Sequence, residues 1–182
     1  YLKEIFVLIF PEFDNLDRLV RLKKICDHLK IDRNTLLGVL LIDDKENHEY
    51  FAHKYNIANN IKEKLNLLAN DLKLLRENKD FFGKDLEKNI YLKSKNYLII
   101  LNIINFTNHN KFTVKGFTEA LKNILQTKAY SLPFDGNYLI QNGMKEGSVL
   151  GKVLKEIEKE WINNNFEISK NRVKEIIKIN TN

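Results

Sequence analysis

The sequence is short of the residues that interrupt helices and of those that form disulfides. It holds two prolines and seven glycines in 182 residues, which favours helices over many short strands. Its single cysteine, Cys26, cannot form an internal disulfide, so a secreted, disulfide-bonded domain is not indicated, and we expect Cys26 to be a core residue. No apolar run approaches the roughly 18 residues that a membrane-spanning helix needs. We therefore expect a cytoplasmic protein with no membrane partner.

An initiating methionine is also missing, since the sequence begins at Tyr1 and its only methionine is Met144. We expect a fragment of a longer product, with a processed mature protein as the alternative. The length suits one domain or two small ones, and 43% hydrophobic with 30% charged residues is ordinary for a soluble globular chain. The net charge of +6 admits an RNA or DNA partner through phosphate contacts, although basic and acidic residues are interleaved throughout.

Familiar catalytic motifs are absent too: the sequence has no P-loop and no dinucleotide-binding fingerprint. His48 and His53 resemble a zinc-binding pair, but they stand five residues apart, which places them about 140° apart around a helix. We therefore expect two surface histidines. Asp43 and Asp44 are acidic neighbours that suit a polar turn better than a magnesium site. From these residues alone we assign no catalytic residue, no metal ligand and no cofactor to this chain.

Helical periodicity runs through most of the sequence, most clearly where apolar residues recur from Ile57 to Leu75. The apolar run that starts at Tyr97 could be mistaken for a strand, but no partner strand with alternating apolar residues exists elsewhere. We expect helices over residues 16–29 (capped by Asp14 or Asn15), 35–42, 48–54, 57–75, 85–91 (capped by Asp85), 95–106, 114–127, 148–164 and from Ser169 onward. The sequence thus predicts an all-α array, with a helical body domain at 1–130 and a smaller helical tail at 131–182.

Four of the seven glycines lie within residues 136–151. Gly143 is placed to end a short helix in the left-handed conformation. Gly147 precedes Ser148, an expected N-cap, and Gly151 falls in the first turn of the following helix, where the backbone can be approached closely. Together with the flanking Lys145 and Lys152, this arrangement suits a phosphate at a helix N-terminus. The alternative is that Gly151 only lets two helices pack closely.

Residues 133–154, Pro-Phe-Asp-Gly-Asn-Tyr-Leu-Ile-Gln-Asn-Gly-Met-Lys-Glu-Gly-Ser-Val-Leu-Gly-Lys-Val-Leu, resemble the tail of bacterial tRNA nucleotidyltransferases. These are the CCA-adding enzymes, relatives of the bacterial poly(A) polymerases. The family's glycine-rich tail and its following helix, which often ends in tryptophan, match at Gly136, Leu139, Gly143, Gly147, Gly151 and Trp161. Residues 10–19, 36–41 and 57–65 are similar to the start of the family's helical body, and the likeness is looser over residues 73–131.

The sequence also departs from the family pattern. Tyr138 stands where the family usually has aspartate, and Lys145, Glu146 and Ser148 replace common prolines. The family's catalytic head binds two metal ions through an Asp-x-Asp motif, which this sequence lacks. The most similar stretch is Glu-Phe-Asp at residues 12–14. The neck that selects CTP and ATP is missing as well. The resemblance therefore implies the body and tail of such an enzyme, inactive alone, whose parent would use Mg²⁺ with CTP and ATP to add or repair the 3′ CCA end.

The resemblance implies a tRNA-holding role, in which this part grips the tRNA elbow and T arm for the absent head and neck. Such binding reads A-form shape, phosphates and 2′-hydroxyls rather than base sequence. We expect the main contact at Gly143, Lys145, Gly147, Ser148, Gly151 and Lys152, with Arg172 and Lys174 as neighbours. Two alternatives remain open: a helical protein-interaction module without RNA binding, and an intact enzyme of unrecognised chemistry, against which stands the lack of a clustered catalytic set.

Overall fold

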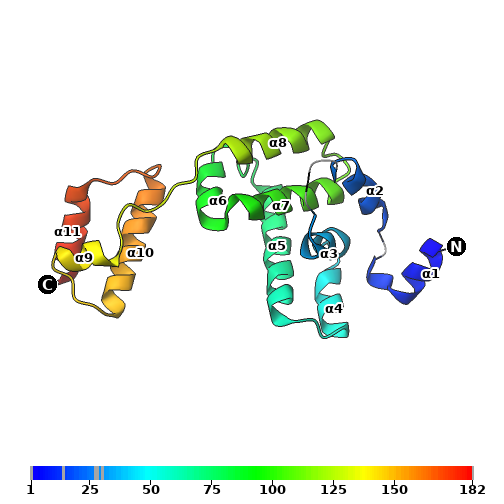
Figure 1. The fold of residues 1–182 in the computed structure, drawn as a ribbon, viewed down its shortest axis with the longest axis horizontal. Helices are drawn as coiled ribbons and strands as arrows, with labels where there is room; N and C mark the ends of the chain where they lie inside the picture. The colour runs from blue at the N-terminus through cyan, green and yellow to red at the C-terminus, as the bar shows by residue number, and fades with distance from the viewer. Residues whose placement is uncertain (1, 14, 27–28, 30, 182) are drawn as a thin grey trace. The chain divides into compact units, whose positions relative to one another are not determined.

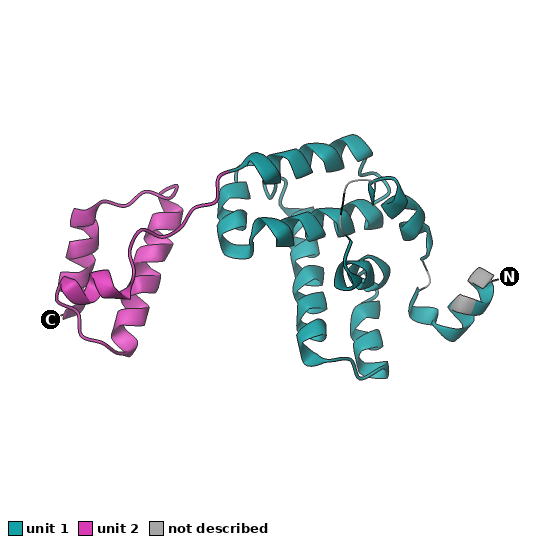
Figure 2. Ribbon diagram, in the orientation of Figure 1, with its two compact units in different colours: residues 1–127 teal, residues 128–182 magenta. Residues whose placement is uncertain are grey.

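The computed structural model describes residues 2–13, 15–26, 29 and 31–181. Over this part of the chain the protein is all-α, as the sequence predicts, with no strand (Figure 1). It divides into two compact units, unit 1 at residues 1–127 and unit 2 at residues 128–182 (Figure 2). The boundary expected from the sequence, between residues 130 and 131, lies just inside unit 2. No helix among the described residues is both long enough and apolar enough to cross a lipid bilayer.

Unit 1 is built around one apolar helix, α7, which α2, α3, α5, α6 and α8 all contact. Leu98, Leu101 and Ile104 of α7 have no exposed surface. This confirms that the apolar run is a helix, and neighbours on every side explain why it lacks a polar face. The helices of the unit are α1 (Leu2–Ile9), the short 3-10 helix η1 (Pro11–Phe13), α2 (Asp17–Lys23), α3 (Arg33–Leu41), α4 (Asn47–Lys54), α5 (Asn59–Glu77), α6 (Leu86–Lys93), α7 (Lys95–Asn108) and α8 (Val114–Gln126).

Two arginines of α2 cap the C-terminal ends of other helices. Arg18 Nη1 donates to the carbonyl oxygens of Val39 and Ile42, at 3.2 and 2.9 Å, at the end of α3. Arg21 donates to the carbonyl oxygen of Phe106 from Nε and Nη2, at 3.0 and 2.7 Å, and to those of two residues beyond α7, His109 and Phe112. The last carbonyls of a helix have no partner within it, so these contacts satisfy groups that burial would otherwise leave unpaired.

A carboxylate also lies inside unit 1, where α5, α6 and α7 meet. Asp71 of α5 accepts hydrogen bonds from Lys93 Nζ at 2.8 Å and from the Tyr97 hydroxyl at 2.6 Å. Burial, together with the hydrogen bond to this carboxylate, raises the pKa of the Tyr97 phenol far above its ordinary value, so Tyr97 stays protonated as the donor. The network fixes the three helices relative to one another.

The start of unit 1 differs from the sequence expectation. Residues 2–9 form a helix that the pattern did not predict, and α2 runs from Asp17 to Lys23 instead of over residues 16–29. Its last turn tightens, because the Lys24 and Ile25 amides bond to carbonyls three residues back. The expected cap Asp14 lies outside the described residues, and no side chain caps α2. Cys26 is half-buried against the core, as expected.

Other local expectations were only partly right. Asp85 is at the N-cap position of α6, yet its carboxylate accepts from Asn78 Nδ2 at 2.8 Å rather than from the helix. His53 is exposed, but the expectation that His48 lies on the surface was wrong, because α4 turns this side chain into unit 1. Burial lowers the pKa of the His48 imidazole, which favours its neutral form.

Unit 2 consists of α9 (Gly136–Gln141), α10 (Ser148–Asn163) and α11 (Lys170–Thr181) around a small apolar core. The core centres on Leu139, Ile157 and Val173, which have no exposed surface. Trp161, near the end of α10, is 2% exposed; its ring meets those of Phe166 and Tyr130 edge-on, with centroids 4.9 and 6.4 Å apart. The Ser169 hydroxyl accepts from the Arg172 amide at 3.1 Å, which confirms the predicted cap of α11.

Candidate nucleic-acid interface

The glycine-rich segment begins with a closed helix end. Gly143 has a φ of 102°, in the region that L side chains rarely adopt, and directly follows Asn142, the C-cap of α9. Its amide donates to the Ile140 carbonyl at 3.0 Å, and the Met144 amide donates to the Leu139 carbonyl at 3.1 Å. These two bonds form a Schellman motif, and the buried Met144 side chain packs in the same core as Leu139. The predicted role of Gly143 as the left-handed residue that ends a short helix is confirmed.

The start of α10 lacks a side-chain cap. Gly147, with a φ of 143°, occupies the N-cap position and α10 begins at Ser148, so the expectation that Ser148 would be the cap was wrong. Glycine has no side chain that could accept a hydrogen bond from the first amides of the helix, and the first turn of α10 contains no acidic residue. Among the described residues, therefore, no side-chain cap and no acidic residue of the first turn pairs with the first amides of α10 or with the positive end of its dipole.

Gly151 lies on the exposed side of the first turn of α10. A Cβ built at this position would meet nothing within 4 Å, so the alternative that Gly151 allows two helices to pack closely is wrong. Lys145 and Lys152 are exposed, and neither forms an ion pair with any residue that the structure describes. The acidic side chain nearest in sequence is Glu146, which is also exposed. The surface is open, uncapped and flanked by two cations.

Two lysines of α11 extend this surface. Thr181 lines a hollow with Lys145, Ser148 and their neighbours, and it also lines a second hollow with Asn142, Lys174 and Lys178. The structure therefore brings Lys174 near the glycine segment, together with Lys178, which the sequence analysis did not single out. The signal for Lys178 is its spacing, because Lys170, Lys174 and Lys178 recur every four residues along α11. We call the surface of Lys145, Gly147, Ser148, Gly151, Lys152, Lys174 and Lys178 the glycine–lysine surface.

Arg172 does not belong to the glycine–lysine surface. It lies in the first turn of α11 and donates from Nε and Nη2 to the two carboxylate oxygens of Glu160, at 2.8 and 3.0 Å, near the opposite end of α10. The hydrogen bond from Arg172 lowers the pKa of the Glu160 carboxyl, and the same contact raises the pKa of the guanidinium. A bidentate pair of this kind holds two helices together.

Nothing in the described residues forms a metal centre: no group of three or more histidine, cysteine, aspartate or glutamate side chains comes together. Asp43 accepts from the backbone amides of Lys45 and Asn47, and Asp44 pairs with Arg76 at 2.6 Å, so both acids serve local structure. No family model matches the chain, and no curated protein or solved structure was found to match it.

Proposed function

We propose that this chain is the tRNA-holding part of a tRNA nucleotidyltransferase, and that the glycine–lysine surface binds the tRNA backbone. The observation that carries the proposal is the uncapped start of α10, where Gly147 and Gly151 leave the backbone open between Lys145 and Lys152. A phosphate can accept from helix amides only if no side chain occupies that space. The same glycines carry the resemblance to the family.

The shape of the surface suits backbone contacts rather than base readout. Its exposed polar side chains are four lysines and Ser148, and ammonium and hydroxyl groups bind phosphate without regard to sequence. A partner set of all tRNAs requires this kind of recognition. The proposal assigns the transfer of CMP and AMP, with Mg²⁺, to a catalytic head and neck of the same enzyme, and it expects this chain alone to be inactive.

The test is binding of the chain to tRNA that lacks its CCA end, at 50 and 200 mM salt, against an RNA hairpin of equal length. We expect tighter binding to tRNA and a steep loss of affinity with salt, because phosphate contacts release counterions. Lys145→Ala and Lys152→Ala should each weaken binding to all tRNAs alike and reduce the salt slope by about one. Lys159→Ala, at an exposed position far along α10, is the control. A loss confined to some tRNAs would refute shape reading.

A second variant separates contact from folding. Gly151→Gln places a neutral side chain over the first turn of α10, where the space is open. Glutamine is a better helix former than glycine, so unit 2 should remain folded. Affinity for tRNA should nevertheless fall, because the side chain blocks the approach of a phosphate. Unchanged affinity in a folded Gly151→Gln protein would remove α10 from the interface.

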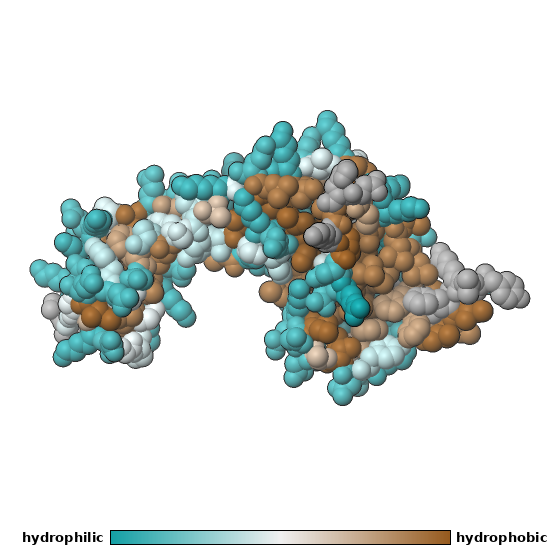
Figure 3. Space-filling model, viewed as in Figure 1, coloured by the Kyte–Doolittle hydropathy of each residue, from teal (hydrophilic) through white to brown (hydrophobic). Residues whose placement is uncertain are grey.

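The second candidate function is a protein-interaction module without RNA binding, and one observation favours it. On α1, Ile5, Leu8 and Ile9 are exposed, Leu8 by 83%, and Figure 3 shows apolar surface gathered where α1 lies. Contiguous apolar surface is typical of a protein contact. This function predicts binding that resists salt and ignores RNA, so equal and weak binding to tRNA and hairpin would favour it.

A further inference from the structure

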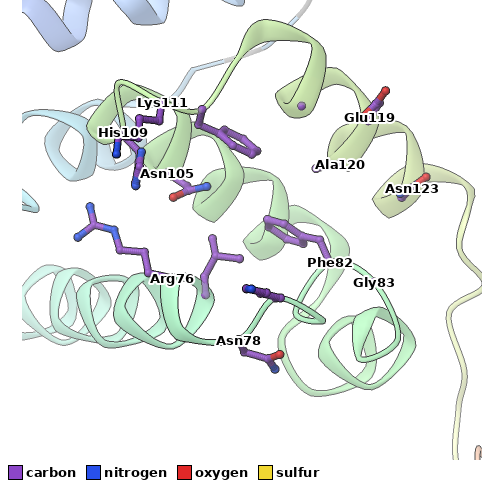
Figure 4. Close-up of a pocket in the computed structure, with 14 residues that line it drawn as sticks. Arg76, Asn78, Phe82, Gly83, Asn105, His109, Lys111, Glu119, Ala120 and Asn123 are labelled. Carbon is purple, nitrogen blue, oxygen red and sulfur yellow. The ribbon is translucent and has the colours of Figure 1, made fainter.

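Unit 1 contains a pocket that the proposed function does not use. It has a volume of about 570 Å³ and lies between the end of α5, the loop into α6, the end of α7 with the loop that follows it, and one side of α8 (Figure 4). Pockets of this size commonly hold a small organic molecule. The carbonyl oxygens of His109 and Phe112, on the α7–α8 loop, are held by Arg21, so this wall of the pocket is fixed.

A buried amide points into this pocket without a partner. Asn105 of α7 is 7% exposed, and its side chain makes no hydrogen bond with any residue that the structure describes. On the same helix, the amide nitrogens of Asn102 and Asn108 donate to the Phe117 carbonyl at 3.1 Å and to the Ile42 carbonyl at 2.8 Å, while their amide oxygens are buried without a partner. The polar atoms of the Asn105 amide are not among the fully buried unpaired atoms of the described residues, so they are open to the pocket, where a bound molecule with a donor and an acceptor side by side would pair with both.

Two aromatic rings line the same pocket. Phe82 meets Phe81 edge-on, at 5.3 Å and 89°, and Figure 4 shows its ring directed toward the hollow that the Asn105 amide also faces. Phe112 lies against α8, where a Cβ at Gly116 would stand 3.3 Å from its ring. Both rings are half-buried, which leaves part of their surface to a ligand. Phenylalanine rings beside an amide suit a flat heterocycle that carries polar edges.

The rim of the pocket carries positive charge. Lys79 and Lys111 are exposed and form no ion pair with the described residues, whereas Arg76 is paired with Asp44. The one acidic lining residue, Glu119, pairs with Lys115 at 3.9 Å, and its carboxylate points away from the hollow in Figure 4. If the flat ligand carries an anionic group that extends out of the pocket, this group would therefore lie near the cations of the rim.

We propose that this pocket binds one unpaired nucleotide. Its base lies against Phe82 and Phe112 with a polar edge on the Asn105 amide, and its phosphate lies near Lys79 and Lys111. Adenine presents an adjacent donor and acceptor that match an asparagine amide. The nucleotide comes either from single-stranded RNA or from free solution. The proposal goes beyond the tRNA-holding function, because shape reading by unit 2 requires no unpaired base.

The test uses the full chain and four probes: AMP, a five-nucleotide oligoadenylate, a blunt RNA duplex and inorganic phosphate. We expect saturable binding of AMP or the oligoadenylate. Asn105→Ala should weaken it about tenfold, as for loss of a paired base edge, and Lys111→Ala about threefold, as for one exposed charge contact. Lys122→Ala, at an exposed position on α8 outside the pocket, should leave it unchanged. Since Lys111 is exposed, its variant tests the pocket even if Asn105→Ala fails to fold.

The outcomes separate the two sources of the nucleotide and the two sites. Binding of the oligoadenylate in preference to AMP identifies RNA, and the reverse identifies a free nucleotide. The proposal is overturned if neither binds at millimolar concentration, if phosphate or duplex displaces bound AMP as well as unlabelled AMP does, or if Asn105→Ala and Lys111→Ala change nothing. The double variant Lys145→Ala with Lys152→Ala should lose tRNA binding and keep AMP binding, so each proposal can fail without the other.

Discussion

The same substitution at two glycines of unit 2 should change stability in opposite directions. At Gly143, φ is 102°, so alanine is strained although a Cβ would meet nothing within 4 Å. The strain costs about 1–3 kcal/mol in the folded state. Alanine also reduces the conformational entropy of the unfolded chain, which offsets about 0.4–1 kcal/mol of this cost. We expect Gly143→Ala to destabilise unit 2 by about 1–2 kcal/mol. Gly151 is helical and unobstructed, so Gly151→Ala should stabilise the unit by about 0.5–1 kcal/mol.

Trp161 makes the measurement specific to unit 2. It is the only tryptophan of the chain and is buried in that unit, so its fluorescence during urea denaturation follows unit 2 even when unit 1 is present. With a urea dependence of about 1 kcal/mol per molar for a unit this small, the midpoint should fall by about 1–2 M for Gly143→Ala and rise by about 0.5–1 M for Gly151→Ala.

Asparagine provides the control for this argument. Gly143→Asn should lose less stability than Gly143→Ala, because asparagine tolerates positive φ better than alanine does. The reasoning is refuted if Gly143→Ala matches the original protein in stability, or if Gly151→Ala lowers it. Unchanged stability of Gly143→Ala would mean that the residue after α9 is not left-handed. A loss of stability in Gly151→Ala would mean that the space beside α10 is not open.

The remaining predictions concern unit 1. Asp71→Ala should destabilise unit 1 by about 3 kcal/mol, because Lys93 loses its buried partner. Tyr97→Phe should destabilise it by only about 1 kcal/mol, because one hydrogen bond is lost. Far-UV circular dichroism during denaturation measures both effects, and equal effects would contradict the network. Burial raises the pKa of the Glu12 carboxyl, but the hydrogen bond from Lys54 Nζ at 2.7 Å, a backbone hydrogen bond and the charge of Lys54 together outweigh it, so the pKa lies below its ordinary value. The stabilisation is therefore complete above pH 4.5 and is lost as pH falls through the lowered pKa. Glu12→Gln should be less stable than the original protein at neutral pH and approach it in acid, and a constant difference would contradict this.

Local patterns predicted the helices with a one-sided or fully apolar surface. The stripe from Ile57 to Leu75 corresponds to α5, except that Ile57 lies two residues before the helix begins. The apolar run after Tyr97 lies in α7, which many helices surround. The left-handed Gly143 was also readable, since a glycine after a short helix has few other roles. These features depend on neighbours within about one helical turn.

Features that depend on residues far apart in the sequence could not be predicted from it. His48 is buried because of what packs on α4, and the caps of α3 and α7 come from Arg18 and Arg21 rather than from nearby residues. The pocket brings together Phe82, from the loop between α5 and α6, and Asn105 of α7, and neither stands in a motif. Part of the candidate site was found through the glycine spacing, whereas Lys178 and the true cap Gly147 required the fold.

The caps on α7 also bear on the order in which the chain acquires its structure. Arg21 precedes the carbonyl of Phe106 by 85 residues and that of Phe112 by 91. During synthesis α2 therefore emerges long before its partners exist, and contacts of such wide separation form slowly. By contrast, the pair of Arg172 and Glu160 in unit 2 spans only 12 residues. Unit 2, which is synthesised last, can thus fold soon after it emerges. The first helices of unit 1 can complete their contacts only after more than half of the chain has been synthesised.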